Sequence, residues 1–263
     1  SSNFSKSFLT NYLNQLIYNK MISRNSNFRP YDKTGILRSR SPKTYKKRLK
    51  MKEGNLVVKK IKNSNFFLPL VTHDLMSNLD ELNKINLKFT IFQIFRNPFD
   101  LTYSWYRCGL GKRWGRDPRL FSMTITKNKK NFPWYVYNYK TTKGLDSLNE
   151  VELCAIYIIS QIKKTLKNIK KLKNKKNLYI TDYYYLIENP EKELKNIAKF
   201  LKTDFSHKTK RHIKIENCPN FSVSNQLERK KLFIKRKIKK EIFVKLLECE
   251  KKHRNNIYNL RRL

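Results

Sequence analysis

Arg96 directly follows an apolar segment at 89–95, and Ser104 stands eight positions after Arg96. Both faces of this segment are mostly apolar, which is typical of a parallel strand covered on both sides. Parallel sheets bind their ligands at the carboxyl ends of the strands. Arg96 would therefore face the ligand crevice, where its charge could hold an anion. An arginine that merely extends its charged head from the edge of a sheet explains the position equally well.

Asn97 and Pro98 predict that a helix follows this strand at once. Asparagine is a favoured N-cap residue, and proline fits the first position of a helix. We expect the helix over 98–106, so that Ser104 lies on the same helix that Arg96 precedes.

A second candidate anion site lies at the N-terminus, where Ser5, Lys6 and Ser7 precede a helical pattern at 7–19. They look like the end of a phosphate-binding loop, with Ser5 where glycine usually stands. The N-terminus of a helix offers free N–H groups and a favourable dipole to phosphate. An ordinary serine-rich helix cap is the alternative.

The elements that would position these residues alternate along the chain. Helices are expected over 7–19, 74–83, 98–106, 150–172 and 190–201, and strands over 66–71, 89–95 and 178–181. This order predicts an α/β fold with a central parallel sheet flanked by helices. We expect a single domain over 1–263, with mostly loop at 22–55 around a basic helix at 42–51, an irregular insertion at 108–147 and a basic helical tail at 227–263.

The composition of the chain limits the classes of function that are compatible with it. The chain has 263 residues, 39% of them hydrophobic and 13% aromatic, which argues against disorder. The net charge of +39 attracts anions, although abundant Lys, Asn and Ile also fit the coding bias of an AT-rich genome. Because the basic residues are spread over many segments, we expect no specific nucleic-acid partner. The four cysteines form no CxxC pair, which suits a reducing compartment.

The motifs together resemble the sulfotransferases that use 3′-phosphoadenosine 5′-phosphosulfate (PAPS). The family's second motif is similar to Arg-Asn-Pro-x-Asp-x-x-x-Ser-x-Tyr, and the chain matches it at Arg96, Asn97, Pro98, Asp100, Ser104 and Tyr106. Its first motif resembles Pro-Lys-Ser-Gly-Thr-Thr-Trp-Leu, which corresponds here to "SNFSKSFL" at 2–9. The stretch "LPLVTHDL" resembles the family's Lys-Thr-His segment, and "TDYYYLIENPEKELKNIAKFL" resembles its Tyr-Glu-Asp-Leu segment.

The resemblance implies a P-loop-like core and a role for each matched residue. Arg96 and Ser104 would bind the 3′-phosphate of PAPS, and Tyr183 would pack near the adenine. Ser5, Lys6, Ser7 and Phe8 would line the 5′-phosphosulfate. His73 would be the general base, which fits an imidazole pKa near neutrality. A structural histidine is the alternative, and Asp74 is a second candidate base. No metal is required, and His207, His212 and His253 read as surface residues.

The chain departs from the family pattern at three places. The lysine of the first motif falls on Asn3, and Lys6 is the candidate substitute that would face the leaving phosphate. The lysine before the catalytic histidine falls on Val71. The C-terminal Arg-Lys-Gly motif, which also holds the 3′-phosphate, is missing. Its charge would come from one of the basic residues at 208–211 or 229–231, which are Lys208, Lys210, Arg211, Arg229, Lys230 and Lys231.

The acceptor is not identified by the sequence. Candidates are a polysaccharide, a lipid, a small metabolite or a protein tyrosine, and the aromatic and cationic residues near the insertion suit a sugar or an anionic glycan. They are Trp105, Arg107, Lys112, Arg113, Trp114 and Arg116. A solvated loop with an aromatic anchor is the alternative. No apolar run long enough to cross a bilayer and no signal peptide is visible, so we expect a cytoplasmic protein. The chain starts with Ser-Ser instead of Met, and no strand precedes the phosphate-loop segment, so we also expect a fragment whose first strand lies upstream.

Two other functions were weighed against this one. A phosphate-loop kinase would need a metal-holding aspartate at a strand end, for which Asp182 is the candidate, but it leaves the Arg-Asn-Pro motif unexplained. A non-catalytic basic protein that binds nucleic acid would show binding that falls steeply with salt, and it would have no adenosine pocket.

Overall fold

The computed structural model describes residues 2–21, 76–79, 89–113, 124–127, 130–133, 147–172 and 175–260. The chain divides into two compact units, Ser1–Leu87 and Lys88–Leu263. The expected basic helix at 42–51 and strand at 66–71 lie outside the described residues. A single domain over 1–263 stays a prediction.

The first unit contains the helix α1, Ser2–Met21, and the short 3-10 helix η2, Met76–Asn78. α1 begins five residues earlier than the pattern at 7–19 predicts. Ser5, Lys6 and Ser7 therefore lie within the helix, and the prediction that they form a loop before it is wrong.

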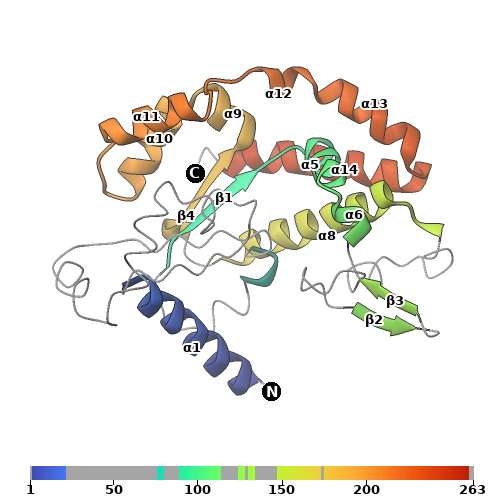
Figure 1. Ribbon diagram of the computed structural model, residues 1–263, viewed down its shortest axis with the longest axis horizontal. Helices are drawn as coiled ribbons and strands as arrows, with labels where there is room; N and C mark the ends of the chain where they lie inside the picture. Colours follow the sequence, from blue (N-terminus) through green and yellow to red (C-terminus); the bar gives the residue numbers. More distant parts are fainter. Residues whose placement is uncertain are drawn as a thin grey trace, which may run out of the picture. The chain divides into compact units, whose positions relative to one another are not determined.

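The second unit is built on two parallel strands, β1 (Ile91–Phe95) and β4 (Leu178–Asp182), shown in Figure 1. Their register pairs Ile91 with Leu178 and Phe95 with Asp182, so that both strands end at one edge. Ile91 and Phe95 are buried, whereas Phe92 and Ile94 are 40% and 49% exposed. The prediction that both faces of this strand are covered is therefore wrong for the face that carries Phe92 and Ile94.

The helix after β1 forms as its local sequence predicts. α5 spans Pro98–Arg107, with Pro98 at its first turn and Asn97 as N-cap. The Asn97 side chain accepts a hydrogen bond from the Phe99 amide at 2.9 Å. This bond satisfies one of the amides that a helix N-terminus leaves unpaired, so the chain turns from strand to helix within two residues.

The long helix α8, Glu150–Lys171, forms the base of the hydrophobic core. A reciprocal capping box starts it: the Asn149 side chain accepts from the Glu152 amide, and the Glu152 carboxylate accepts from the Asn149 amide. Its apolar residues, Ile156, Ile158 and Ile159 among them, are almost fully buried. α8 packs against α5 and against the last helix of the chain.

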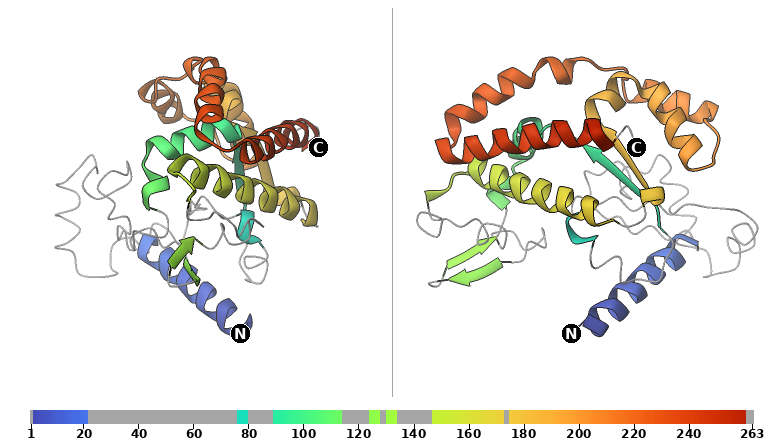
Figure 2. Two further views of the ribbon diagram at one scale, coloured as in Figure 1. Left: turned by 90° about the vertical axis from the view of Figure 1, so that its right-hand side faces the viewer. Right: turned by 180° about the vertical axis from the view of Figure 1, so that it is seen from behind.

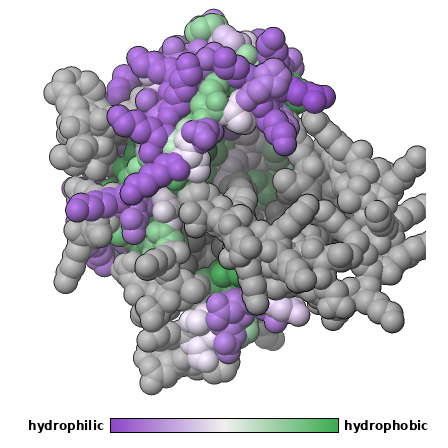
Figure 3. Space-filling view, turned by 90° about the vertical axis from the view of Figure 1, so that its left-hand side faces the viewer, coloured by the Kyte–Doolittle hydropathy of each residue, from purple (hydrophilic) through white to green (hydrophobic). Residues whose placement is uncertain are grey.

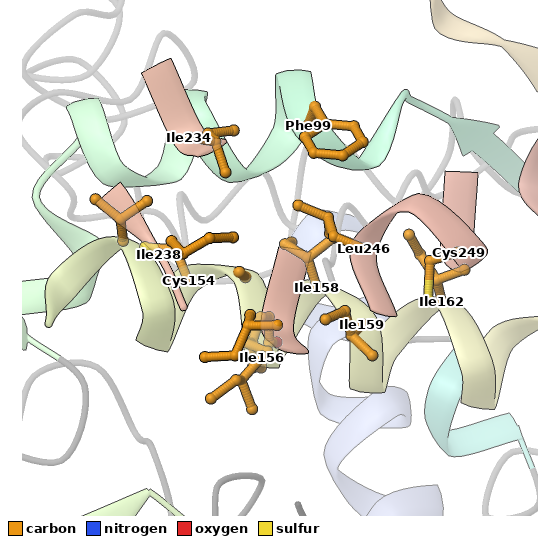
Figure 4. Close-up of a cluster of buried hydrophobic side chains, with 14 residues drawn as sticks. Phe99, Cys154, Ile156, Ile158, Ile159, Ile162, Ile234, Ile238, Leu246 and Cys249 are labelled. Carbon is orange, nitrogen blue, oxygen red and sulfur yellow. The ribbon is translucent and has the colours of Figure 1, made fainter. Parts of the chain in front are cut away.

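The last two helices complete this core instead of forming a tail. α13 (Leu227–Lys237) and α14 (Lys240–Leu260) bury a stripe of residues, Ile234, Ile238, Ile242, Leu246 and Cys249, against α5 and α8. Figure 4 shows members of this stripe facing the α8 side chains and Phe99. Most of its basic residues are exposed, with Lys230 as a buried exception, so the prediction of a helical, basic segment holds, but the segment is part of the packed fold. Figure 2 shows α14 beside α8 in both further views.

Several shorter elements were not predicted. The expected irregular insertion contains α6 (Leu110–Arg113) and an antiparallel pair, β2 (Thr124–Lys127) and β3 (Lys130–Pro133). The 3-10 helix η5 (Lys175–Asn177) precedes β4, and α9 (Tyr183–Glu188) follows it directly. α10 (Pro190–Phe200) confirms the helix expected at 190–201, whereas α11 (His207–Ile215) and α12 (Ser222–Asn225), which lead to α13, were not predicted. Within the described residues, no helix is long and apolar enough to cross a membrane.

Candidate functional site

Arg96 lies at the carboxyl end of β1, at the edge where β4 also ends. Its Nε donates a hydrogen bond to Oδ2 of Asp100 at 2.6 Å, across the first turn of α5. Its guanidinium lies over the ring of Tyr183, with the central carbon 4.5 Å from the ring centroid. Tyr183 begins α9 immediately after β4. The ends of both strands therefore contribute to holding one arginine, whose side chain is 24% exposed.

Asp100 joins Arg96 to the C-terminal helices. Its other oxygen, Oδ1, accepts a hydrogen bond from Lys230 Nζ at 2.6 Å, and Lys230 lies on α13. The Asp100 carboxylate is 1% exposed and the Lys230 side chain 11% exposed. Burial raises the pKa of Asp100, but hydrogen bonds and charges from Arg96 and Lys230 outweigh that effect and hold its pKa below the ordinary value. Two cations thus share one carboxylate, which leaves one net positive charge.

We call Arg96, Asp100 and Lys230 together the Arg96 cluster. Tyr184 lies beside this cluster. Its hydroxyl is buried and comes close to the Asp100 carboxylate without reaching hydrogen-bond geometry. Burial, together with the negative charge of Asp100, raises the pKa of Tyr184. The phenol therefore stays protonated and is a neutral neighbour to the three charges.

A second buried network supports the Arg-Asn-Pro turn from α14. Nδ2 of Asn97 donates to Oε1 of Glu250 at 2.7 Å, while the same side chain caps α5 through its oxygen. Lys231 Nζ lies 2.9 Å from that Glu250 oxygen, and Arg254 lies 3.6 Å from it. His253, one turn farther along α14, is 4% exposed and packs edge-on against Phe95. The expectation that His253 is a surface residue is wrong, because α14 lies against the end of β1.

The structure separates the candidates for the missing C-terminal cation. Lys208, Lys210 and Arg211 are exposed on α11. Figure 3 shows that hydrophilic residues gather on the upper part of one face of the molecule. Arg229 is also exposed, and Lys231 is paired with Glu250. Among these candidates, Lys230 is the residue that contacts Asp100 and so joins Arg96 at the strand ends. Sequence alone could not choose it, because the choice depends on which face of α13 meets α5.

The other predicted site residues are distributed as follows. Ser104 is half-buried on α5, one turn beyond Asp100 and on the same face of the helix. Ser5, Lys6, Ser7 and Phe8 belong to α1 of the first unit, where Ser7 and Phe8 are exposed. His73 and Asp74 lie outside the described residues.

The structure also shows the surroundings of the aspartate of the kinase alternative and of the residues predicted to contact the acceptor. Asp182, the metal-holding candidate of the kinase alternative, caps α9 by accepting a hydrogen bond from the Tyr185 amide at 3.0 Å. Across the described part of the chain, no cluster of three or more His, Cys, Asp or Glu residues could hold a metal ion. Trp105, a predicted acceptor contact, stacks on Tyr157 at 4.9 Å between ring centroids, whereas Arg107 and Lys112 are exposed. His207 and His212 are exposed, as expected.

The fold and the Arg96 cluster define an α/β protein with a cationic site where its parallel strands end. The Sulfotransferase domain family matches residues 3–254, which is nearly the whole chain. The chain belongs to this sulfotransferase family, as the motifs predicted. The family match also agrees with the two-stranded parallel sheet and the flanking helices. No curated protein and no solved structure matches the chain.

Proposed function

We propose that this protein transfers a sulfuryl group from PAPS to a hydroxyl or amine of an acceptor. The observation that carries the proposal is Arg96, which the family motif assigns to the 3′-phosphate and which lies at the strand ends over Tyr183. Parallel α/β sheets bind their ligands at this edge. The net positive charge of the Arg96 cluster suits a phosphate group.

Arg96, Ser104 and Lys230 are proposed to recognise the 3′-phosphate. A guanidinium presents a planar fork of N–H donors that matches phosphate oxygens, and charge-assisted bonds are the stronger class of hydrogen bond. Ser104 adds a hydroxyl donor from the same helix. Lys230 supplies the positive potential that the family's C-terminal motif would otherwise bring. Tyr183 provides an aromatic surface for the adenosine part of the donor.

The transfer itself is assigned to residues of the first unit. Breaking the S–O bond to the 5′-phosphate leaves negative charge on that phosphate, which Lys6 and donors from Ser5 and Ser7 are proposed to stabilise, with Phe8 beside them. The acceptor oxygen or nitrogen forms the new bond to sulfur, and its proton passes to His73. Transfer of this kind depends mainly on positioning and on charge stabilisation in the transition state.

A carbohydrate is one proposed class of acceptor. The exposed cations Arg107 and Lys112, at the end of α5 and on α6, support an acceptor that carries negative charge. Incubation with sulfur-labelled PAPS and a panel of glycans, phenols and amines would identify it by transfer of the label.

Calorimetric titration of the full chain with adenosine 3′,5′-bisphosphate and, in parallel, with AMP tests the donor site. We expect the bisphosphate to bind at least tenfold more tightly, because charge-assisted hydrogen bonds contribute about 1.5–3 kcal/mol each. Equal affinity for the two nucleotides would refute the proposed function.

A further inference from the structure

Asp100 contacts Arg96, the arginine proposed to bind phosphate, and this contact leaves most of the N–H donors of Arg96 unused. It accepts a hydrogen bond from Nε of Arg96, at 2.6 Å, so that contact occupies one of the five N–H groups of a guanidinium. The four N–H groups on the terminal nitrogens remain and can form a fork for phosphate oxygens. The Tyr183 ring, 4.5 Å away, supports one face of the same group. The guanidinium of Arg96 is therefore restrained at its Nε edge by Asp100 and on one face by the Tyr183 ring.

Asp100 is itself held in a fixed place. It lies in the first turn of α5, two residues after Pro98, and its side chain is 1% exposed. Each of its oxygens accepts from a different cation, Oδ2 from Arg96 and Oδ1 from Lys230. A carboxylate so paired repels a phosphate and has no donor to offer it. Its contribution to anion binding must therefore act through Arg96.

The geometry points to Asp100 as a positioning residue that fixes Arg96 in the orientation in which it receives the 3′-phosphate. This inference rests on the proposed function, since it concerns the same site. Lys230 anchors the second oxygen of Asp100, so that α13 sets the position of the carboxylate. The cluster keeps one net positive charge. Because the Arg96 side chain is already held in place, binding of the phosphate costs less conformational entropy.

Two effects of removing Asp100 oppose each other, and their balance tests the inference. Asp100→Asn keeps the shape and one acceptor oxygen, but it raises the net charge of the cluster from +1 to +2. If charge alone decided the affinity, the bisphosphate would bind more tightly to D100N. If positioning decides it, the bisphosphate binds more weakly while AMP, which lacks the 3′-phosphate, is unaffected.

The experiment measures the ratio of AMP to bisphosphate dissociation constants by calorimetry on the full chain. We expect Asp100→Asn to lower this ratio about tenfold, which is the lower end of the loss seen when the residue that orients a metal-binding side chain is replaced. In an Arg96→Met background the same substitution should change nothing, because Asp100 acts through the arginine. Asp204→Asn removes an exposed carboxylate and is the matched control for charge.

Two comparisons keep the result interpretable. If D100N fails to fold in a thermal unfolding control, Lys230→Met is compared with Lys230→Met/Asp100→Asn, since the double variant restores the wild-type net charge of +1. A ratio that is unchanged or higher without Asp100, or a drop of equal size in the Arg96→Met background, would overturn the inference. If wild type itself shows no preference for the bisphosphate, the proposed function fails first, and the inference fails with it.

Discussion

Leu246→Ala tests whether the C-terminal helices are part of the core. Leu246 is 0% exposed on α14 and belongs to the same buried cluster as Phe99 and Ile158 (Figure 4). Truncation to alanine removes the transfer free energy of the side chain and leaves a cavity between helices that already pack closely. Substitutions of this kind cost about 2–5 kcal/mol, and we expect roughly 3 kcal/mol here. For a unit of this size the midpoint of thermal unfolding should fall by about 10 °C.

Urea denaturation followed by circular dichroism measures this loss. Leu232→Ala is the matched control, because Leu232 lies on the neighbouring helix α13 with 56% of its surface exposed. The control should change the free energy of unfolding by less than about 0.5 kcal/mol. A loss below about 1 kcal/mol for Leu246→Ala would show that the segment is a loosely attached tail, as the sequence alone suggested.

Three further substitutions have expected effects. Burial lowers the pKa of His253 from 6.5 to about 4, so folding favours the neutral ring and stability should fall as the pH drops from about 6.5 to 4, by about 3 kcal/mol in all. His253→Leu should remove this pH dependence in urea titrations. Gly111→Ala would place a Cβ 2.8 Å from Glu150 Cβ and against the Glu150 carbonyl oxygen, so we expect a loss of about 1–3 kcal/mol in thermal unfolding. Asn149→Ala removes the cap of α8 and a bond to the Lys237 carbonyl oxygen, which should cost about 1–2 kcal/mol in urea unfolding.

Each of these substitutions has a matched control in the same unit. His212→Leu, at an exposed histidine, should leave the pH profile of wild type intact. Gly109→Asn should be mild, because nothing lies within 4 Å of the added Cβ and asparagine tolerates the positive φ of 71°. Asn196→Ala, on the exposed side of α10, should be neutral or slightly stabilising. Equal effects in a variant and its control would contradict the contact on which that prediction depends.

The parts of the fold that sequence predicted are those specified by neighbouring residues. Asn97 and Pro98 start α5 through a cap and a fixed φ angle, and the capping box at Asn149 starts α8. The strand before Arg96 was predicted because its apolar run is short and ends at these signals. Such local preferences act over three or four residues, so they do not depend on which partner the element later packs against.

The rest of the site depends on contacts between distant segments. Lys230 reaches Asp100 across 130 positions and Glu250 reaches Asn97 across 153 positions, and no local pattern encodes either pairing. A partial signal did exist for α13 and α14. Ile234, Ile238 and Ile242 recur every four residues and would have indicated a buried stripe within the basic segment. His253 continues that stripe, although its charged neighbours suggested a surface position.

The most direct test of the account is the calorimetric affinity of the wild type and of Arg96→Met for adenosine 3′,5′-bisphosphate and for AMP. The account predicts that wild type prefers the bisphosphate at least tenfold and that Arg96→Met loses this preference while it still binds AMP. Equal affinities of wild type for the two nucleotides, or a preference that survives Arg96→Met, would contradict the claim that Arg96 receives the 3′-phosphate of the donor.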